Sequence, residues 1–172
     1  VSVMAANNEI GVLQPICEIG ALCKEKGIAF HTDAAQAFGY LDLEPDKLNI
    51  DFMSLSAHKI YGPKGVGALV YKKGLPIYPM QWGGGQENGL RSGTLPVPLI
   101  VGFAKSVEIA IQDLKNRNKR LLYLRNLLFN GLKDNLPGLI LNGSHDLRLP
   151  HNLNITFPGV NGSRLHSQLR RF

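Results

Sequence analysis

Lys59 is the side chain of this 172-residue sequence that is best placed for covalent chemistry. It follows a short apolar run at 51–55, which predicts a buried strand, and a turn rich in glycine and proline begins shortly after it. Ser56 and His58 add a hydroxyl and an imidazole beside it. A desolvated lysine loses its proton more readily and can then form a Schiff base with an aldehyde. The alternative is a solvated surface lysine, because lysine is seldom buried.

Asp33 is the second candidate, within the run HTDAAQ that begins at His31. A predicted strand at 27–31 places Asp33 near a strand's carboxyl end, where open α/β sheets bind ligands. Lys59 follows 26 residues later, about one strand–crossover–strand unit, so the two can meet over one ligand. Pyridoxal phosphate needs such a pair, because a lysine holds its aldehyde and an aspartate keeps its pyridine nitrogen protonated. Asp33 could instead only cap a helix at 34–38.

The elements that position these residues alternate between strands and helical crossovers. Apolar runs and turn residues predict strands at 1–5, 27–31, 51–55, 66–71 and 77–82, a helix at 16–26 and a short crossover at 34–40. Further along we expect one very long helix or two in succession at 96–136, strands at 139–142 and 153–157, and a helix from 162. This order predicts an α/β sheet that is at least partly parallel, followed by a smaller α+β part.

A glycine-rich stretch at 83–89 precedes Arg91 and Thr94. Such a stretch is often a flexible loop. The functional alternative is a loop whose backbone amides and Thr94 hydroxyl approach a phosphate, with Arg91 as a planar anion clamp.

Three motifs in this order, HTDAAQ, SLSAHKIYGPKG and GGGQENGLRSGT, resemble those of the cysteine desulfurases, within the class V aminotransferase-like pyridoxal-phosphate enzymes. The resemblance runs from VSVMAANNEIG to NLNITFPGV, and RSGT favours desulfurases over more distant relatives. It implies the fold type I architecture. Residues 1–114 would then be part of the cofactor-binding large domain, and 115–172 a connecting helix with an incomplete small domain.

The resemblance also implies a role for each matching residue. Lys59 would carry the cofactor and act as the catalytic base, while Ser56 and His58 would hydrogen-bond its phosphate. Asp33 would pair with the pyridine nitrogen, and Gln36 would donate to the phenolic oxygen.

Three further matches complete the implied site. Asn8 would lie near the phenolic oxygen and the substrate carboxylate. Thr94 would reach a phosphate in the partner subunit of a homodimer. His31 would support the site rather than touch the cofactor.

The implied reaction removes sulfur from L-cysteine to give L-alanine and an enzyme persulfide. The sulfur would pass to an acceptor or iron–sulfur scaffold protein for cluster or thio-cofactor assembly, in the cytoplasm or, for a eukaryotic parent, in a mitochondrial or plastid matrix. The alternatives are a selenocysteine lyase or another class V enzyme, and, in a different class, a non-catalytic relative that binds sulfur-transfer partners.

Several parts of the family's site have no match here, namely the nucleophilic cysteine, the phosphate-binding loop, the ring-stacking histidine and the arginine for the substrate carboxylate. The sequence also begins and stops inside predicted elements. We therefore expect a fragment that is inactive as a desulfurase by itself.

The composition argues against several other classes of function. The net charge of +6 arises from 19 Lys and Arg against 13 Asp and Glu, but the basic residues are spread out and lack interleaved aromatics, so we expect no nucleic-acid partner. No apolar run approaches the roughly 20 residues that span a bilayer, so we expect no membrane partner. Cys17 and Cys23 share the predicted helix without metal-ligand spacing, which predicts two reduced core residues.

Overall fold

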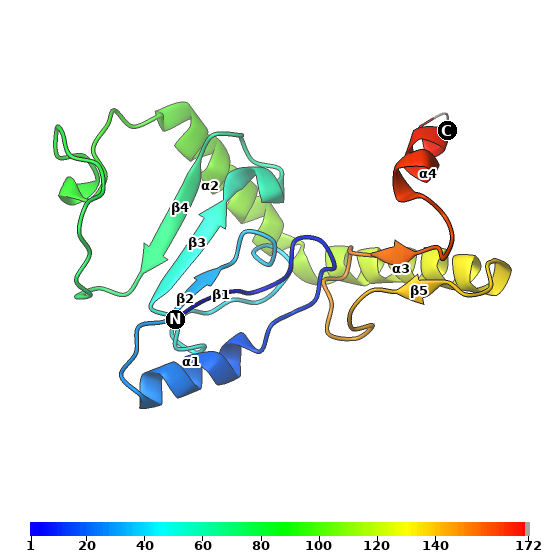
Figure 1. The fold of residues 1–172 in the computed structure, drawn as a ribbon. Coiled ribbons are helices and arrows are strands. Elements are labelled where there is room, and N and C mark those ends of the chain that lie inside the picture. The colour runs from blue at the N-terminus through cyan, green and yellow to red at the C-terminus, as the bar shows by residue number, and fades with distance from the viewer. Residues whose placement is uncertain (171–172) are drawn as a thin grey trace. The chain divides into compact units, whose positions relative to one another are not determined.

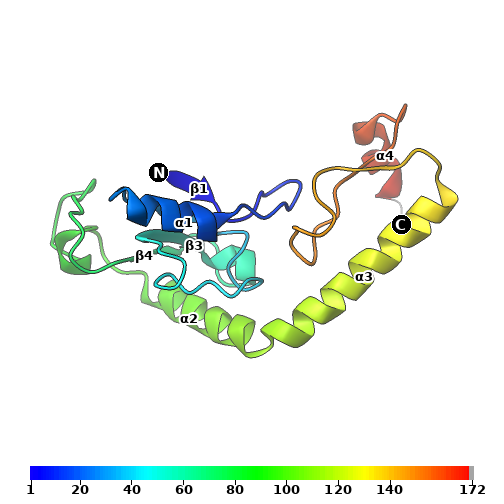
Figure 2. The same ribbon diagram turned by 90° about the horizontal axis from the view of Figure 1, so that it is seen from below.

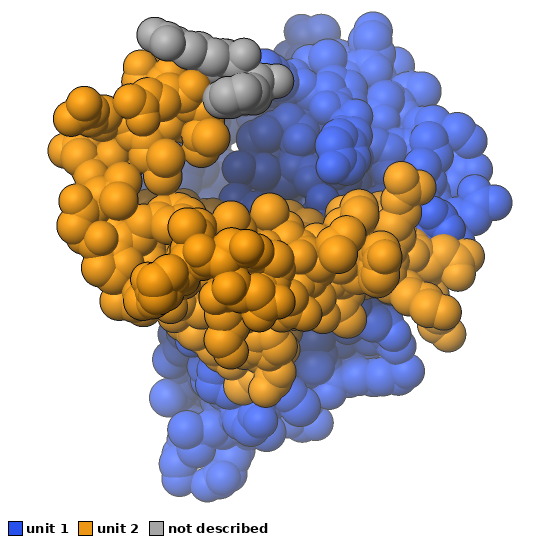
Figure 3. Space-filling view, turned by 90° about the vertical axis from the view of Figure 1, so that its right-hand side faces the viewer, with its two compact units in different colours: residues 1–5, 14–114 blue, residues 6–13, 115–172 orange. Residues whose placement is uncertain are grey.

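The computed structural model describes residues 1–170, in two compact units. Unit 1 comprises Val1–Ala5 and Gln14–Leu114, and unit 2 comprises Ala6–Leu13 and Lys115–Phe172 (Figure 3). Unit 2 thus takes a short segment from between the first strand and the first helix of unit 1. The predicted assignment of 1–114 and 115–172 to a large and a small domain stays a prediction.

Unit 1 is built on a four-stranded sheet in the order β1-β2-β3-β4 (Figure 1). The strands are β1 (Ser2–Met4), β2 (His31–Asp33), β3 (Phe52–Ser56) and β4 (Gly67–Tyr71). The first three are parallel and β4 is antiparallel to β3, which confirms the prediction of a sheet that is at least partly parallel. Because the carboxyl ends of β2 and β3 point the same way, the residues after them share one edge of the sheet.

The helices of unit 1 are α1 (Ile16–Glu25), the 3₁₀ helices η1 (Ala57–Ile60) and η2 (Glu87–Gly89), and α2 (Val97–Gln112). Helix α2 runs along one face of the sheet (Figures 1 and 2). Phe103 and Ala110 of α2 form a buried cluster with Ala57 and Ile60 of η1, and Leu55 of β3 packs against it. The short helix that carries Lys59 is therefore fixed by the core.

Unit 2 contains α3 (Leu114–Asn135), the antiparallel pair β5 (Ile140–Leu141) and β6 (Ile155–Thr156), and α4 (Gly162–Leu169). The expected helical stretch at 96–136 is two helices, because Asp113 leaves the helical conformation with φ −111° and ψ 16°. Within residues 1–170 no helix is both long and apolar enough to cross a membrane.

Several expectations from the sequence were wrong. Residues 77–82 form no strand, and Trp82 there is 81% exposed, because Pro76 and Pro79 cannot donate hydrogen bonds to a sheet. The crossover at 34–40 is a set of turns rather than a helix. Cys17 is exposed while Cys23 is buried, because six residues along α1 place two side chains about 120° apart around the axis.

Candidate active site

One face of the unit 1 sheet carries a group of polar side chains, and residues at the centre of the other face are buried. Residues paired across neighbouring strands share a face, and successive residues alternate between faces. The registers Ser2–His31–Phe52 and Met4–Asp33–Ser54 therefore share one face with Ser56, and we refer to it as the polar face because its hydroxyl, imidazole and carboxylate groups lie beside only two apolar residues of β1–β3. On the opposite face Thr32 and Met53 are buried. A parallel sheet covered on both faces normally carries apolar residues on both, so the polar face indicates a site.

His31 bridges three strands on this polar face. Its Nδ1 lies 2.7 Å from Ser2 Oγ, and its Nε2 lies 2.8 Å from Ser54 Oγ. Both ring nitrogens are thus occupied by hydroxyls of β1 and β3. This geometry supports the expectation that His31 braces the site rather than binding a cofactor.

Asp33 ends β2 and is exposed. Its Oδ1 accepts a hydrogen bond of 2.9 Å from the Ala35 N–H, so the carboxylate does cap the following turns. Its Oδ2 accepts no hydrogen bond and forms no ion pair within residues 1–170. The capping and ligand-binding interpretations of Asp33 are therefore compatible, because Oδ1 caps the turns while Oδ2 can bind a ligand. Gln36 lies half-buried in the same turns.

Lys59 lies on η1, directly after β3. Ala57 and Ile60, three residues apart in a 3₁₀ helix, face the core, so His58 and Lys59 face outward and are exposed. Ser56 Oγ lies 2.9 Å from His58 Nδ1. Lys59 Nζ forms no ion pair with any residue of the described chain. Its side chain is exposed to solvent, whereas the Schiff-base interpretation of the sequence assumed a desolvated lysine.

Gly62 makes the close approach of η1 to α2 possible. A methyl group at this position would lie 2.6 Å from Ser106 Oγ and 2.9 Å from the Ala57 carbonyl oxygen. We expect Gly62→Ala to lower the free energy of unfolding by about 1–3 kcal/mol, measured by urea unfolding followed by circular dichroism. Gly131→Ala, in a helix with open space around it, is the matched control and should be neutral or stabilising. Equal stability of both variants would contradict this close packing.

The glycine-rich stretch is an ordered loop with its own hydrogen bonds. Gly93 N–H donates to Gln86 Oε1 at 2.9 Å, and Arg91 Nη1 donates to the Ser92 carbonyl at 3.0 Å. Ser92 is buried and Thr94 is exposed. Arg91 thus has one guanidinium arm engaged within the loop.

Asn8 belongs to unit 2 and is exposed in the segment Ala6–Leu13. The structure therefore brings Asp33, Ser56, His58 and Lys59 to one edge of unit 1, whereas Asn8 belongs to unit 2. Sequence reasoning missed Asn152 and Asn154, which contact the Asn8 segment. The available signal was their spacing of two residues at the start of the strand-like run at 153–157. Among residues 1–170 no cluster of His, Cys, Asp and Glu could hold a metal ion.

Comparison with known proteins identifies the class. Residues 1–171 match the family described as Aminotransferase class-V, and the chain belongs to this family. Two similar curated relatives are the cysteine desulfurase IscS of Ehrlichia chaffeensis, 51% identical over 96% of this chain, and that of Clostridium botulinum strain Kyoto, 50% identical over 96%. The chain spans 41% and 42% of their lengths.

Solved structures agree with this family. A NifS-like protein superposes with a TM-score of 0.94 at 43% identity, covering 99% of this chain and 47% of that one. A NifS-like protein from Rickettsia africae gives 0.91 at 36% identity, covering 95% and 45%. The comparisons confirm the resemblance to cysteine desulfurases inferred from the three motifs, and with it the predicted fold class.

Proposed function

We propose that this chain forms the lysine-bearing part of a pyridoxal-phosphate-dependent cysteine desulfurase. The observation that carries the proposal is the shared edge of β2 and β3, where Asp33 follows one parallel strand and the Ser56–Lys59 segment follows the next. Membership of the class V family supports it.

The groups at this edge fit the cofactor. Lys59 offers an exposed amine without an ion pair in the described residues, which can bind an aldehyde. Asp33 offers a carboxylate oxygen for a protonated ring nitrogen. Ser56 and His58, already 2.9 Å apart, offer a hydroxyl and a ring nitrogen for a phosphate.

When bound, pyridoxal phosphate supplies an electron sink for the bonds broken at the substrate Cα. Lys59 Nζ would hold the aldehyde and later accept the Cα proton as a general base. Asp33 Oδ2 would keep the ring nitrogen protonated, while Oδ1 stays on the Ala35 N–H. His31 would keep β1 and β3 in register beside it.

The whole protein would convert L-cysteine to L-alanine and pass the sulfur, as a cysteine persulfide, to an acceptor or iron–sulfur scaffold protein. Neither cysteine of this chain is proposed as the nucleophile, because Cys23 is buried and Cys17 lies outside any matching motif. We further propose that the protein works as a cytoplasmic homodimer. Gln36 and Asn8 would bind the phenolic oxygen, and Thr94 a phosphate of the partner subunit.

Borohydride trapping after incubation with pyridoxal phosphate, followed by peptide mapping, tests the site directly. We expect the chain to carry a reduced phosphopyridoxyl group on Lys59, because this lysine alone would be directed by the neighbouring phosphate ligands. Lys59→Ala should abolish the label. Lys64→Ala removes an exposed lysine five positions away and should retain it. Labelling spread over many lysines, or absent, would count against the proposal.

A chimera tests the activity. This chain would replace the matching segment of the Ehrlichia chaffeensis relative, with which it shares 51% identity. Sulfide and alanine should then form from L-cysteine in a Lys59-dependent manner. A chimera that binds the cofactor but leaves L-cysteine unchanged would contradict the proposed reaction.

A further inference from the structure

The loop that carries Asn8 is held in part by hydrogen bonds between its own residues. Asn7 Oδ1 accepts hydrogen bonds of 2.9 Å from both the Glu9 and Ile10 N–H groups. The Gly11 N–H donates to the Asn7 carbonyl at 3.1 Å. The Asn7 side chain is thus engaged within the loop, and Asn8 beside it is exposed.

Two side-chain amides hold this loop from a distant part of the chain. Asn152 Nδ2 and Asn154 Nδ2 donate to the Glu9 carbonyl at 3.0 Å and 3.2 Å. A carbonyl oxygen has two lone pairs, so the two amide donors together occupy both acceptor positions of the Glu9 carbonyl. Residues two apart on an extended segment point to the same side, which is why both amides reach one oxygen.

The orientation of each amide is determined by what its oxygen accepts. Arg148 Nη1 donates to Asn152 Oδ1 at 3.0 Å. Asn142 Nδ2 donates to Asn154 Oδ1 at 2.8 Å. Because a donor occupies each oxygen, the NH₂ groups must face the Glu9 carbonyl.

Arg148 is itself fixed, with 5% of its surface exposed. Its guanidinium donates to the carbonyls of Ser144 and Asn142 as well as to Asn152. Burial lowers the pKa of Arg148, and the nearby charge of Arg125 lowers it further. Bonds from such a charged donor are stronger than neutral ones, so the Asn152 amide has a rigid support.

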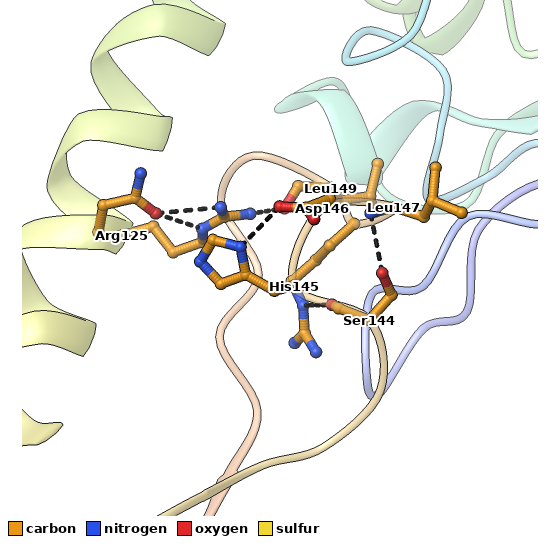
Figure 4. A network of polar contacts seen from close by, with 8 residues as sticks. Arg125, Ser144, His145, Asp146, Leu147 and Leu149 are labelled. Atoms are coloured by element: carbon orange, nitrogen blue, oxygen red, sulfur yellow. Dashed lines mark hydrogen bonds and ion pairs between the residues drawn. The ribbon is translucent and has the colours of Figure 1, made fainter.

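The same segment is anchored to α3 and to the loop backbone. Arg125 of α3 donates to the Leu149 carbonyl at 3.5 Å (Figure 4). The Leu149 N–H donates to the Gly11 carbonyl at 2.9 Å. Gly11 has φ +69°, and a methyl group there would collide with the Asn152 side chain. The loop and the Asn152 side chain are therefore in close contact as well as hydrogen-bonded.

We infer that Asn152 and Asn154 are positioning residues, which hold the Glu9 carbonyl and thereby fix the conformation of the loop that carries Asn8. The inference rests on the proposed function for the role of Asn8. The two asparagines themselves act only through the loop.

Asn152→Asp separates positioning from general stability. The aspartate keeps an oxygen for Arg148 and gains an ion pair with it, so the variant should unfold at the same or a higher urea concentration. It places a carboxylate oxygen against the Glu9 carbonyl and removes one donor. Asn154→Asp is the second variant, with Asn142 retained as the donor to its oxygen.

The first readout needs no cofactor. Hydrogen exchange at the Glu9, Ile10 and Gly11 amides should be about tenfold faster in each variant, because one hydrogen bond that closes the loop is lost. The matched control is Asn135→Asp, whose amide donates to the Gly131 carbonyl at 2.7 Å, and it should leave these amides unchanged. Unchanged exchange in both Asn152→Asp and Asn154→Asp would overturn the inference.

The second readout connects the loop to Asn8. The chimera's dissociation constant for pyridoxal phosphate should rise about three- to tenfold in Asn152→Asp. In an Asn8→Ala background the same change should have no further effect. Additive losses would overturn the inference, because Asn152 would then act independently of Asn8. Failure of the unsubstituted chimera to bind the cofactor would instead contradict the proposed function.

Discussion

Asp33→Asn should lower the turnover of L-cysteine by the chimera about 10²- to 10³-fold, while leaving the borohydride label on Lys59 in place. Asparagine keeps an oxygen for the Ala35 N–H, so the cap after β2 survives. It puts a neutral amide where the free carboxylate oxygen stands and can no longer keep a ring nitrogen protonated. The expected signature is a fall in kcat without loss of the attached cofactor.

Asp42→Asn controls for the loss of one exposed negative charge elsewhere in unit 1 and should leave turnover unchanged. The ratio of rates is measured as alanine formed per bound cofactor, so that weaker loading is not mistaken for slower chemistry. An Asp33→Asn enzyme within threefold of the parent rate would show that this carboxylate is only a cap.

The largest effect on stability is expected at Phe30, which is 0% exposed. Phe30→Ala should lower the free energy of unfolding by about 3–5 kcal/mol, because it removes a buried aromatic ring and leaves a cavity. The Phe30 carbonyl also accepts hydrogen bonds from the Asp51 and Phe52 N–H groups, so a shift here reaches the start of β3. Urea unfolding followed by circular dichroism measures the change.

Ile28→Ala is the matched control, two residues away and 47% exposed in the parent. It should lower the free energy of unfolding by less than about 1 kcal/mol. Similar losses at both positions would indicate that Phe30 is less tightly packed than its burial implies.

Local patterns were sufficient to predict the edge that carries Asp33 and Lys59. Apolar runs followed by polar residues marked the ends of β2 and β3, and a spacing of 26 residues fits neighbouring parallel strands. The prediction of where β2 starts was less accurate. The strand begins at His31 and not at residue 27, because the Phe30 N–H donates to Asp51 Oδ2 instead of to a neighbouring strand.

The support of the Asn8 loop could not be predicted from local patterns. Its bonds join Glu9 to residues 143 and 145 positions further along the chain, and hydrophobic periodicity carries no information about such a pairing. The amides that form them are common in turns, where they usually bond their own backbone. Only the fold shows that these two face a carbonyl from the beginning of the sequence.

That separation along the chain also sets an order of events during synthesis on the ribosome. Residues 6–13 emerge well before the amides that bind the Glu9 carbonyl, which follow Glu9 by 143 and 145 positions. At 5–20 residues per second, the nascent loop waits roughly 7–29 s for these partners. Until then it has the bonds that Asn7 makes within the loop and the bond from the Gln14 N–H to the Ala5 carbonyl at its base, and β1 can already pair with β2. The segment that carries Asn8 is thus completed only long after it has been made.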